Sequence, residues 1–101
     1  MPLSKNNEAA LPWEEFSVDT ITEITPNFSL IVWNDEVNTF DWVIDTLMEV
    51  CEHSQEQAEQ CAMFIHYKGK YAVKKGDYDF LKPMCDAITD RGIGATIEVF
   101  V

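Results

Sequence analysis

The segment from Phe28 to Cys51 constrains the fold most strongly, because its hydrophobic pattern changes from that of a strand to that of a helix across a short polar turn. Residues 28–33, FSLIVW, are apolar and partly β-branched, as in a strand covered by other elements. Asn38 can cap the following helix, with Asp41 at its third position. Apolar residues then recur at helical spacing, at Phe40, Val43, Leu47, Val50 and Cys51.

A second helix is predicted immediately afterwards. Residues 54–57, SQEQ, form a capping box, in which the first and fourth side chains satisfy backbone donors of the first turn. The helix should stop near Tyr67, because Gly69 suits a left-handed C-terminal cap. Its small and apolar residues follow at positions i, i+3, i+4 and i+7, namely Ala58, Cys61, Ala62 and Ile65.

The last third of the chain predicts a strand, a helix and a strand. Tyr71 and Val73 alternate with smaller or polar residues before a glycine, which is typical of a short strand. Residues 77–91 have a helical pattern, although Pro83 lacks an amide donor and should kink this helix or delay its start. Residues 95–101 alternate with a period of two, as in a half-exposed strand. The resulting β-α-α-β-α-β order suits a small sheet with helices stacked on one face.

Length and composition predict one domain preceded by an extension. A chain of 101 residues with 47% hydrophobic residues can bury a single modest core. Residues 1–26 are polar and contain three prolines, the last of them Pro26, so we expect a flexible N-terminal extension before a core domain at 27–101. Within the extension Leu11, Trp13 and Phe16 leave two possibilities open, packing on the domain or on a partner.

Charge and cysteine usage exclude several classes of function. Seven basic against 18 acidic residues give a formal charge of −11, which disfavours nucleic acid and anionic membranes as partners. The apolar runs are far shorter than the roughly 20 residues that cross a bilayer, and residues 1–7 lack the apolar stretch of a signal peptide. We therefore expect a cytoplasmic protein. Its three cysteines, on apolar helix faces, are expected to be reduced: Cys51, Cys61 and Cys85.

Motifs for catalysis or metal binding are not recognisable in the sequence. Cys51 and His53 offer only two metal ligands, and neither a nucleophile elbow nor a phosphate-binding glycine loop occurs. An enzyme would have to pair Asp35 or Glu36 with His66 as acid and base, with a cysteine as nucleophile. We favour a protein without catalytic residues, metal or cofactor.

The polar turn and the end of the second helix instead suit an ammonium group attached to a hydrophobic side chain. A free α-ammonium carries three donors and is costly to desolvate without acceptors. Such acceptors could be Asn34 Oδ1, the Asp35 carboxylate and a neutral His66 imidazole. The apolar helix face beside them could receive the hydrophobic side chain.

In these segments the chain resembles the ClpS family, from about Phe28 to Val101. The matching motifs are NDE at 34–36, FxxVIDxL at 40–47, Ala58, IHYxGK at 65–70 and TIE at 96–98. The resemblance implies a monomeric α+β adaptor domain, with three helices on one face of a three-stranded antiparallel sheet. Members hand N-degron substrates, which begin with Leu, Phe, Tyr or Trp, to the N-terminal domain of a ClpA/ClpC-type AAA+ unfoldase. A generic interaction domain of the same fold, without amine recognition, is the alternative.

The resemblance also implies roles for individual residues. The substrate α-amine would be bound by Asn34, Asp35 and His66. The hydrophobic pocket would be formed by Asn38, Phe40, Val43, Ala62, Ile65 and Ile93, and the unfoldase would dock on Asp77 and Lys82. Family members often have Thr, Pro and Met at positions 38–40 and Met at position 62. The alanine at 62 should therefore leave one wall of the pocket open.

Overall fold

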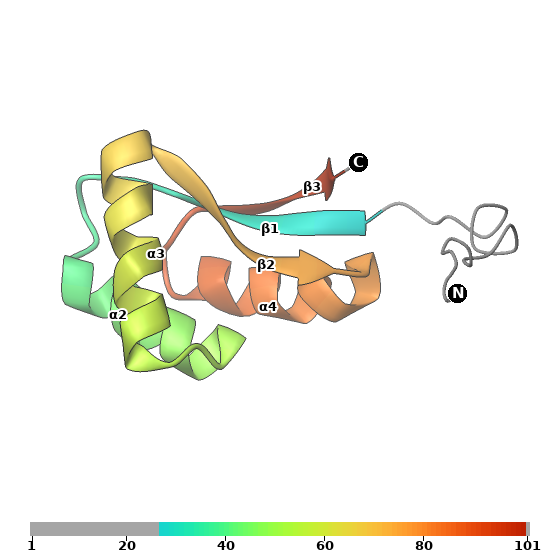
Figure 1. Cartoon of the computed structure of the whole chain (residues 1–101), viewed down its shortest axis with the longest axis horizontal. Coiled ribbons are helices and arrows are strands. Elements are labelled where there is room, and N and C mark those ends of the chain that lie inside the picture. The colour runs from blue at the N-terminus through green and yellow to red at the C-terminus, as the bar shows by residue number, and fades with distance from the viewer. Residues whose placement is uncertain (1–26, 101) are drawn as a thin grey trace, which may run out of the picture.

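The computed structural model describes residues 27–100 and contains six elements in that range. They are β1 (Asn27–Trp33), α2 (Phe40–Cys51), α3 (Gln55–Lys68), β2 (Lys70–Gly76), α4 (Tyr78–Asp90) and β3 (Ala95–Phe100). The strands form one antiparallel sheet in the order β2-β1-β3, with the helices on one side of it (Figure 1). The predicted α+β fold is thus confirmed, whereas the predicted extension at 1–26 lies outside the described residues.

Strand β1 is central because it pairs with both β2 and β3, and it is buried on both faces. Leu30 and Val32 are fully buried against the helices, and Ile31, which points to the other face, is only 8% exposed. In its pairing with β2, Leu30 pairs with Lys74 while Ile31 pairs with Ala72, so Val73 is an extra residue that forms a bulge in β2.

None of the helices in the described range is long and apolar enough to span a lipid bilayer.

The core lies between the sheet and the helices, and it contains cysteine thiols. All three cysteines are free in the structure, and their reduced state stays a prediction. Burial raises the pKa of the Cys51 thiol to about 11 and also raises the pKa of Cys61 and Cys85. The buried cluster comprises Leu30, Val32, Ile44, Leu47, Cys51, Ala58, Cys61, Ala62, Ile65, Val73, Leu81, Ile88 and Ile93.

Helix boundaries follow the predicted caps with one correction. Ser54 accepts a hydrogen bond from the Gln57 amide, and Gly69 ends α3 with a φ of 90°, as predicted. The cap of α2, however, is Thr39 and not Asn38, because Thr39 Oγ1 accepts from the Trp42 amide at 3.1 Å. With this cap Asp41 occupies the second helical position, where a carboxylate still faces the positive end of the helix dipole.

Helix α4 accommodates Pro83 in its interior. The helix starts at Tyr78, so of the two predicted effects of Pro83 a delayed start does not occur. Its first turn closes normally, since the amides of Phe80 and Leu81 both donate to the Asp77 carbonyl. The proline removes one intrahelical hydrogen bond further along, while Leu81 and Ile88 anchor the helix in the core.

His53, between α2 and α3, is a buried titratable residue. It is 4% exposed, and its Nε2 lies 3.0 Å from the Val73 carbonyl oxygen, to which it donates in the matching tautomer. Its Nδ1 is buried without a hydrogen-bond partner. Burial lowers the pKa of the imidazole, the Val73 carbonyl opposes this, and the Lys74 ammonium adds to it.

Acidification is therefore expected to destabilise the fold through His53. Because its pKa is lowered in the folded state, the unfolded chain binds more protons below the ordinary histidine pKa of about 6.5. The stabilising contribution is complete above that pH and is lost as the pH falls toward the lowered value. The free energy of unfolding, measured with urea, should fall between pH 7.5 and pH 5.5. The fall should be smaller for His53→Gln than for the unmodified protein, because the glutamine amide does not titrate and can still donate to the Val73 carbonyl. Equal losses in both proteins would contradict the prediction.

Candidate functional site

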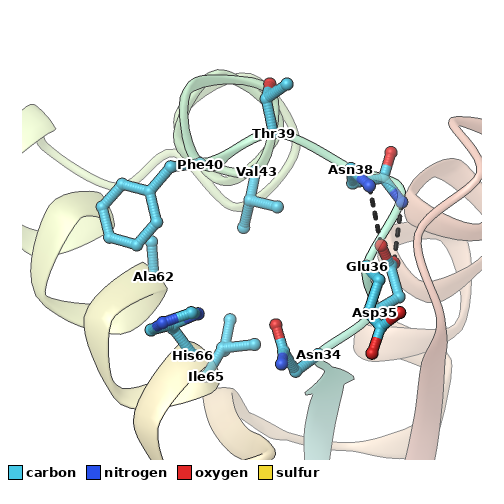
Figure 2. A pocket seen from close by; sticks show the side chains of 10 residues that line it. All are labelled: Asn34, Asp35, Glu36, Asn38, Thr39, Phe40, Val43, Ala62, Ile65 and His66. Carbon is cyan, nitrogen blue, oxygen red and sulfur yellow. Dashed lines mark hydrogen bonds between the residues drawn. The ribbon is translucent and has the colours of Figure 1, made fainter.

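A hollow of about 470 Å³ opens between the β1–α2 loop, the first turn of α2 and the C-terminal half of α3 (Figure 2). Its size is within the range of small-molecule sites. Apolar side chains form the inner wall, and polar side chains of the loop form the opposite wall. The lining residues are Asn34, Asp35, Glu36, Asn38, Thr39, Phe40, Val43, Ala62, Ile65 and His66.

Backbone hydrogen bonds hold the start of the loop against two other elements. The Trp33 amide donates to the Gly94 carbonyl, and the Asn34 amide donates to the Gly69 carbonyl, each at 2.9 Å. Gly69 caps α3 three residues after His66. These bonds explain how Asn34 and His66, which are 32 positions apart, line the same hollow.

Asp35 organises the loop itself. Its Oδ1 accepts from the Val37 amide at 2.8 Å. Asn38 donates twice to the same carboxylate, from its backbone amide to Oδ1 at 2.7 Å and from its side-chain Nδ2 to Oδ2 at 2.8 Å (Figure 2). The backbone and side-chain bonds from Asn38 lower the pKa of the carboxyl, which therefore stays ionised. Since a carboxylate offers about four acceptor positions, roughly one remains for a ligand. The structure thus adds a loop-ordering role to the predicted contact with an amine.

Asn38 joins the loop to the connection between α4 and β3. Its Nδ2 donates to Asp35 Oδ2 and also to the Gly92 carbonyl oxygen at 2.9 Å. This use of the amide explains why Asn38 lines the hollow but does not cap α2. Ile93, predicted as a pocket residue, is only 2% exposed, belongs to the core and does not line the hollow.

Asn34 and His66 provide the uncommitted polar atoms. Their side chains lie on the two sides of Ile65 at one edge of the hollow (Figure 2). Among residues 27–100 neither the side-chain amide of Asn34 nor the His66 ring makes a hydrogen bond, and both residues are exposed. Their acceptor atoms can therefore bind a ligand without breaking an existing bond.

Phe40 and Ala62 form the wall opposite the loop. Ala62 is 3% exposed, and both residues line the hollow (Figure 2). Phe40 is 43% exposed and meets the His66 ring edge to face, with 6.5 Å between the ring centroids. The hollow is thus lined by both a half-exposed large aromatic residue and a buried small one.

Two lining residues, Glu36 and Thr39, were not among the predicted pocket residues. Both belong to the polar turn recognised in the sequence, so their position was the available signal. Thr39 is committed to capping α2. Glu36 is exposed and adds a second carboxylate to the rim.

Asp77 and Lys82, the predicted docking residues, do not come to the hollow. They belong to the start of α4, which follows the end of β2 that lies away from the β1–α2 loop (Figure 1). Asp77 is the N-cap residue, although its side chain makes no capping bond. Lys82 Nζ lies 2.7 Å from Asp86 Oδ1, and this hydrogen bond raises the pKa of the lysine.

The hollow combines an apolar wall with oxygen and nitrogen acceptors and the Asp35 and Glu36 carboxylates. This composition suits a cationic donor attached to an apolar group, because the acceptors replace the water that the donor loses on burial. Within residues 27–100 no group of three or more His, Cys, Asp or Glu side chains is placed to hold a metal ion. The features seen in the hollow are those of a binding site.

Comparison with known proteins places these features in a family. The model for "ATP-dependent Clp protease adaptor protein ClpS" matches residues 23–96. The Clp protease adapter protein ClpS of Corynebacterium jeikeium is 28% identical over 90 residues, which cover 89% of each chain. The ClpS of Campylobacter jejuni subsp. jejuni is 38% identical over 42 residues, which cover 42% of this chain and 44% of that protein. Agrobacterium tumefaciens ClpS2, solved bound to L-phenylalaninamide, shares the fold with a TM-score of 0.66 at 20% identity, covering 74% of this chain and 98% of that one. The chain belongs to the ClpS family of Clp protease adaptors.

Proposed function

We propose that this adaptor binds the free N-terminal residue of N-degron substrates in the hollow and delivers them to a ClpA/ClpC-type AAA+ unfoldase. Leu, Phe, Tyr and Trp are the proposed first residues. The observation that carries the proposal is the pairing of uncommitted acceptors on Asn34 and His66 with the buried wall of Ala62 and Ile65.

The energetics agree with specific but moderate binding. Burying one large apolar side chain contributes about 1.5–3 kcal/mol. Each hydrogen bond to the charged ammonium contributes roughly 1.5–3 kcal/mol more. After the costs of association, an affinity on the order of micromolar or somewhat tighter is expected. His66 can take part only while its imidazole is neutral, because the protonated ring has no acceptor.

The ligand of the Agrobacterium relative fits this chemistry. L-Phenylalaninamide combines a free α-amine with an aromatic side chain, and the relative was solved with it bound. Each part has a matching surface in the present hollow: acceptors for the amine and apolar residues for the ring. We extend that ligand class to this protein as part of the proposal.

Fluorescence anisotropy with labelled peptides that differ only at the first residue tests the proposal. Unblocked Phe, Tyr, Trp and Leu peptides should bind, and N-terminal acetylation should abolish binding because it removes the charge and two of the donors. An Asn34→Ala variant should bind all of them more weakly. Equal binding of free and acetylated peptides would reject amine recognition and favour a generic interaction domain of the same fold.

Ala62 should widen the choice of first residue. Its methyl group leaves room near the wall for a branched β-carbon, so peptides beginning with Ile or Val should bind detectably. In an Ala62→Met variant the longer side chain should lower Ile and Val affinity by about five-fold more than Phe and Leu affinity, or about 1 kcal/mol. Anisotropy titrations with the four peptides measure this difference, and an equal change for all four would contradict a steric role.

Docking of the unfoldase is proposed to use Asp77 and Lys82, so docking and capture should be separable. Lys82→Glu should weaken binding to the N-terminal domain of a Clp unfoldase while peptide affinity stays unchanged. The paired change Lys82→Glu with Asp86→Lys restores the helical ion pair seen at 2.7 Å, so it controls for helix stability. Recovered docking in the paired variant, measured by pull-down, would show that helix stability and not direct contact was responsible.

A further inference from the structure

A second hollow lies on the outer face of α3, and its lining is unusual for a solvated helix surface. Its volume is about 530 Å³, and its residues are Glu56, Glu59, Gln60, Met63, Phe64 and Tyr67. Three of these are large apolar or aromatic residues with 48%, 40% and 76% of their surface exposed, respectively Met63, Phe64 and Tyr67. Exposed apolar side chains gathered in this way typically mark an interaction surface.

The second hollow adjoins the first one, which is proposed to bind the N-terminal residue of a substrate and is here called the pocket. His66 lines the pocket and Tyr67 lines the second hollow, and their rings meet edge to face with centroids 5.4 Å apart. A ligand whose amine reaches His66 therefore has the second hollow directly beside it. Phe64 also stacks on Tyr71 of β2, with 4.7 Å between the ring centroids, and this contact holds one side of the hollow against the sheet.

The charges around this hollow select the class of occupant. Glu56 and Glu59 lie toward the N-terminal end of α3, and no lysine or arginine lines the hollow. One oxygen of Glu59 accepts a hydrogen bond from Gln55, which leaves its other oxygen for a ligand. A second copy of this chain, with a formal charge of −11, is disfavoured by repulsion. The favoured occupant is a peptide that places apolar side chains near Tyr67 and Met63 and a basic side chain near Glu59 and Glu56.

We propose that this hollow, here called the α3 groove, binds the substrate residues that follow the N-terminal residue. This inference rests on the proposed function. Tyr67 and Glu56 are eleven positions apart on α3, or roughly 16 Å at a rise of 1.5 Å per residue. An extended peptide covers that distance with about five residues. The α3 groove thus accommodates an apolar and basic segment at about positions 2–6 of the substrate.

Two ligand lengths separate this inference from the proposed function. L-Phenylalaninamide occupies only the pocket, whereas the peptide Phe-Ala-Leu-Lys-Leu-Ala-Lys can reach both sites. The peptide Phe-Ala-Ser-Glu-Ser-Ala-Glu has the same first residue, but it replaces the apolar and basic residues by serine and glutamate, which the acidic α3 groove should disfavour. With the full-length protein, the apolar and basic peptide should bind about ten-fold more tightly than the acidic one, and part of this advantage should fade with added salt.

Groove variants should remove this advantage without affecting the pocket. Glu59→Lys and Met63→Ser should each reduce it to about two-fold, while phenylalaninamide affinity stays within about two-fold of the unmodified protein. Gln57→Lys places the same positive charge on α3 outside the groove and should retain most of the advantage. Retained discrimination in both groove variants, or none in the unmodified protein, would overturn the inference while phenylalaninamide still binds. Absence of phenylalaninamide binding would reject the proposed function and this inference together.

Discussion

Replacing Asp35 by alanine is expected to weaken binding of an unblocked Phe peptide by roughly 100-fold, or about 2.7 kcal/mol. The carboxylate accepts three hydrogen bonds that shape the loop from Asn34 to Asn38, and it supplies negative charge close to the proposed ammonium position. Without it, the loop must be ordered by the ligand, so part of the binding free energy is lost to ordering. Isothermal titration calorimetry should show a less favourable entropy together with the weaker affinity.

Two comparison variants separate the contribution of loop order to binding from the contribution of the Asp35 charge. Asp35→Asn keeps an acceptor for the amides of Val37 and Asn38 but lacks the charge and the second acceptor, so its affinity should be intermediate. Asp41→Asn removes a carboxylate from the first turn of α2, outside the lining of the hollow, and should bind nearly normally. An Asp35→Ala protein with unchanged affinity would show that neither loop order nor charge contributes to capture.

A shortened protein beginning at Thr25 is expected to capture substrates but to deliver them poorly. Residues 1–26 are polar, contain three prolines and were predicted from the sequence as an extension. The pocket residues described here all follow it, so peptide affinity should be nearly unchanged. Degradation of a folded N-degron substrate by a Clp unfoldase and its protease should fall to near the rate without adaptor. That rate, measured beside peptide affinity and docking, tests the separation of capture from delivery.

The opposing hypothesis is that Trp13 and Phe16 pack on the domain. Their removal would then expose apolar surface and lower the melting temperature. Undiminished degradation by the shortened protein would reject the delivery role. A marked fall in melting temperature would instead reject a purely disordered extension, so thermal unfolding of the same protein completes the test.

Features encoded in short segments could be predicted from the sequence. The capping box at 54–57 and the glycine after α3 define the bounds of that helix through local backbone chemistry. The polar turn and the family motifs also identified most of the residues that line the hollow. Their roles in binding stay predictions, because shared location does not establish contact with a ligand.

Features that depend on competition between partners could not be predicted in this way. Asn38 and Thr39 are both good caps in isolation, and the choice falls on Thr39 because Asn38 donates to Asp35 and to Gly92, 54 residues away. Ile93 is apolar and follows that glycine, yet its side chain turns into the core. The bulge at Val73 likewise depends on pairing across the sheet.

The bond from Asn38 to Gly92 has a consequence for the order of events during synthesis. The residues that line the pocket end at His66, but the loop that carries five of them is fastened to Gly92 and Gly94 near the end of the chain. Contacts so distant in sequence form late, because the intervening chain must be available first. A nascent chain that has emerged from the ribosome only as far as β2 therefore already contains every residue that lines the hollow, but it lacks the Gly92 and Gly94 carbonyls that fasten the loop. The loop therefore reaches its final set of anchors only after the connection between α4 and β3 has been synthesised.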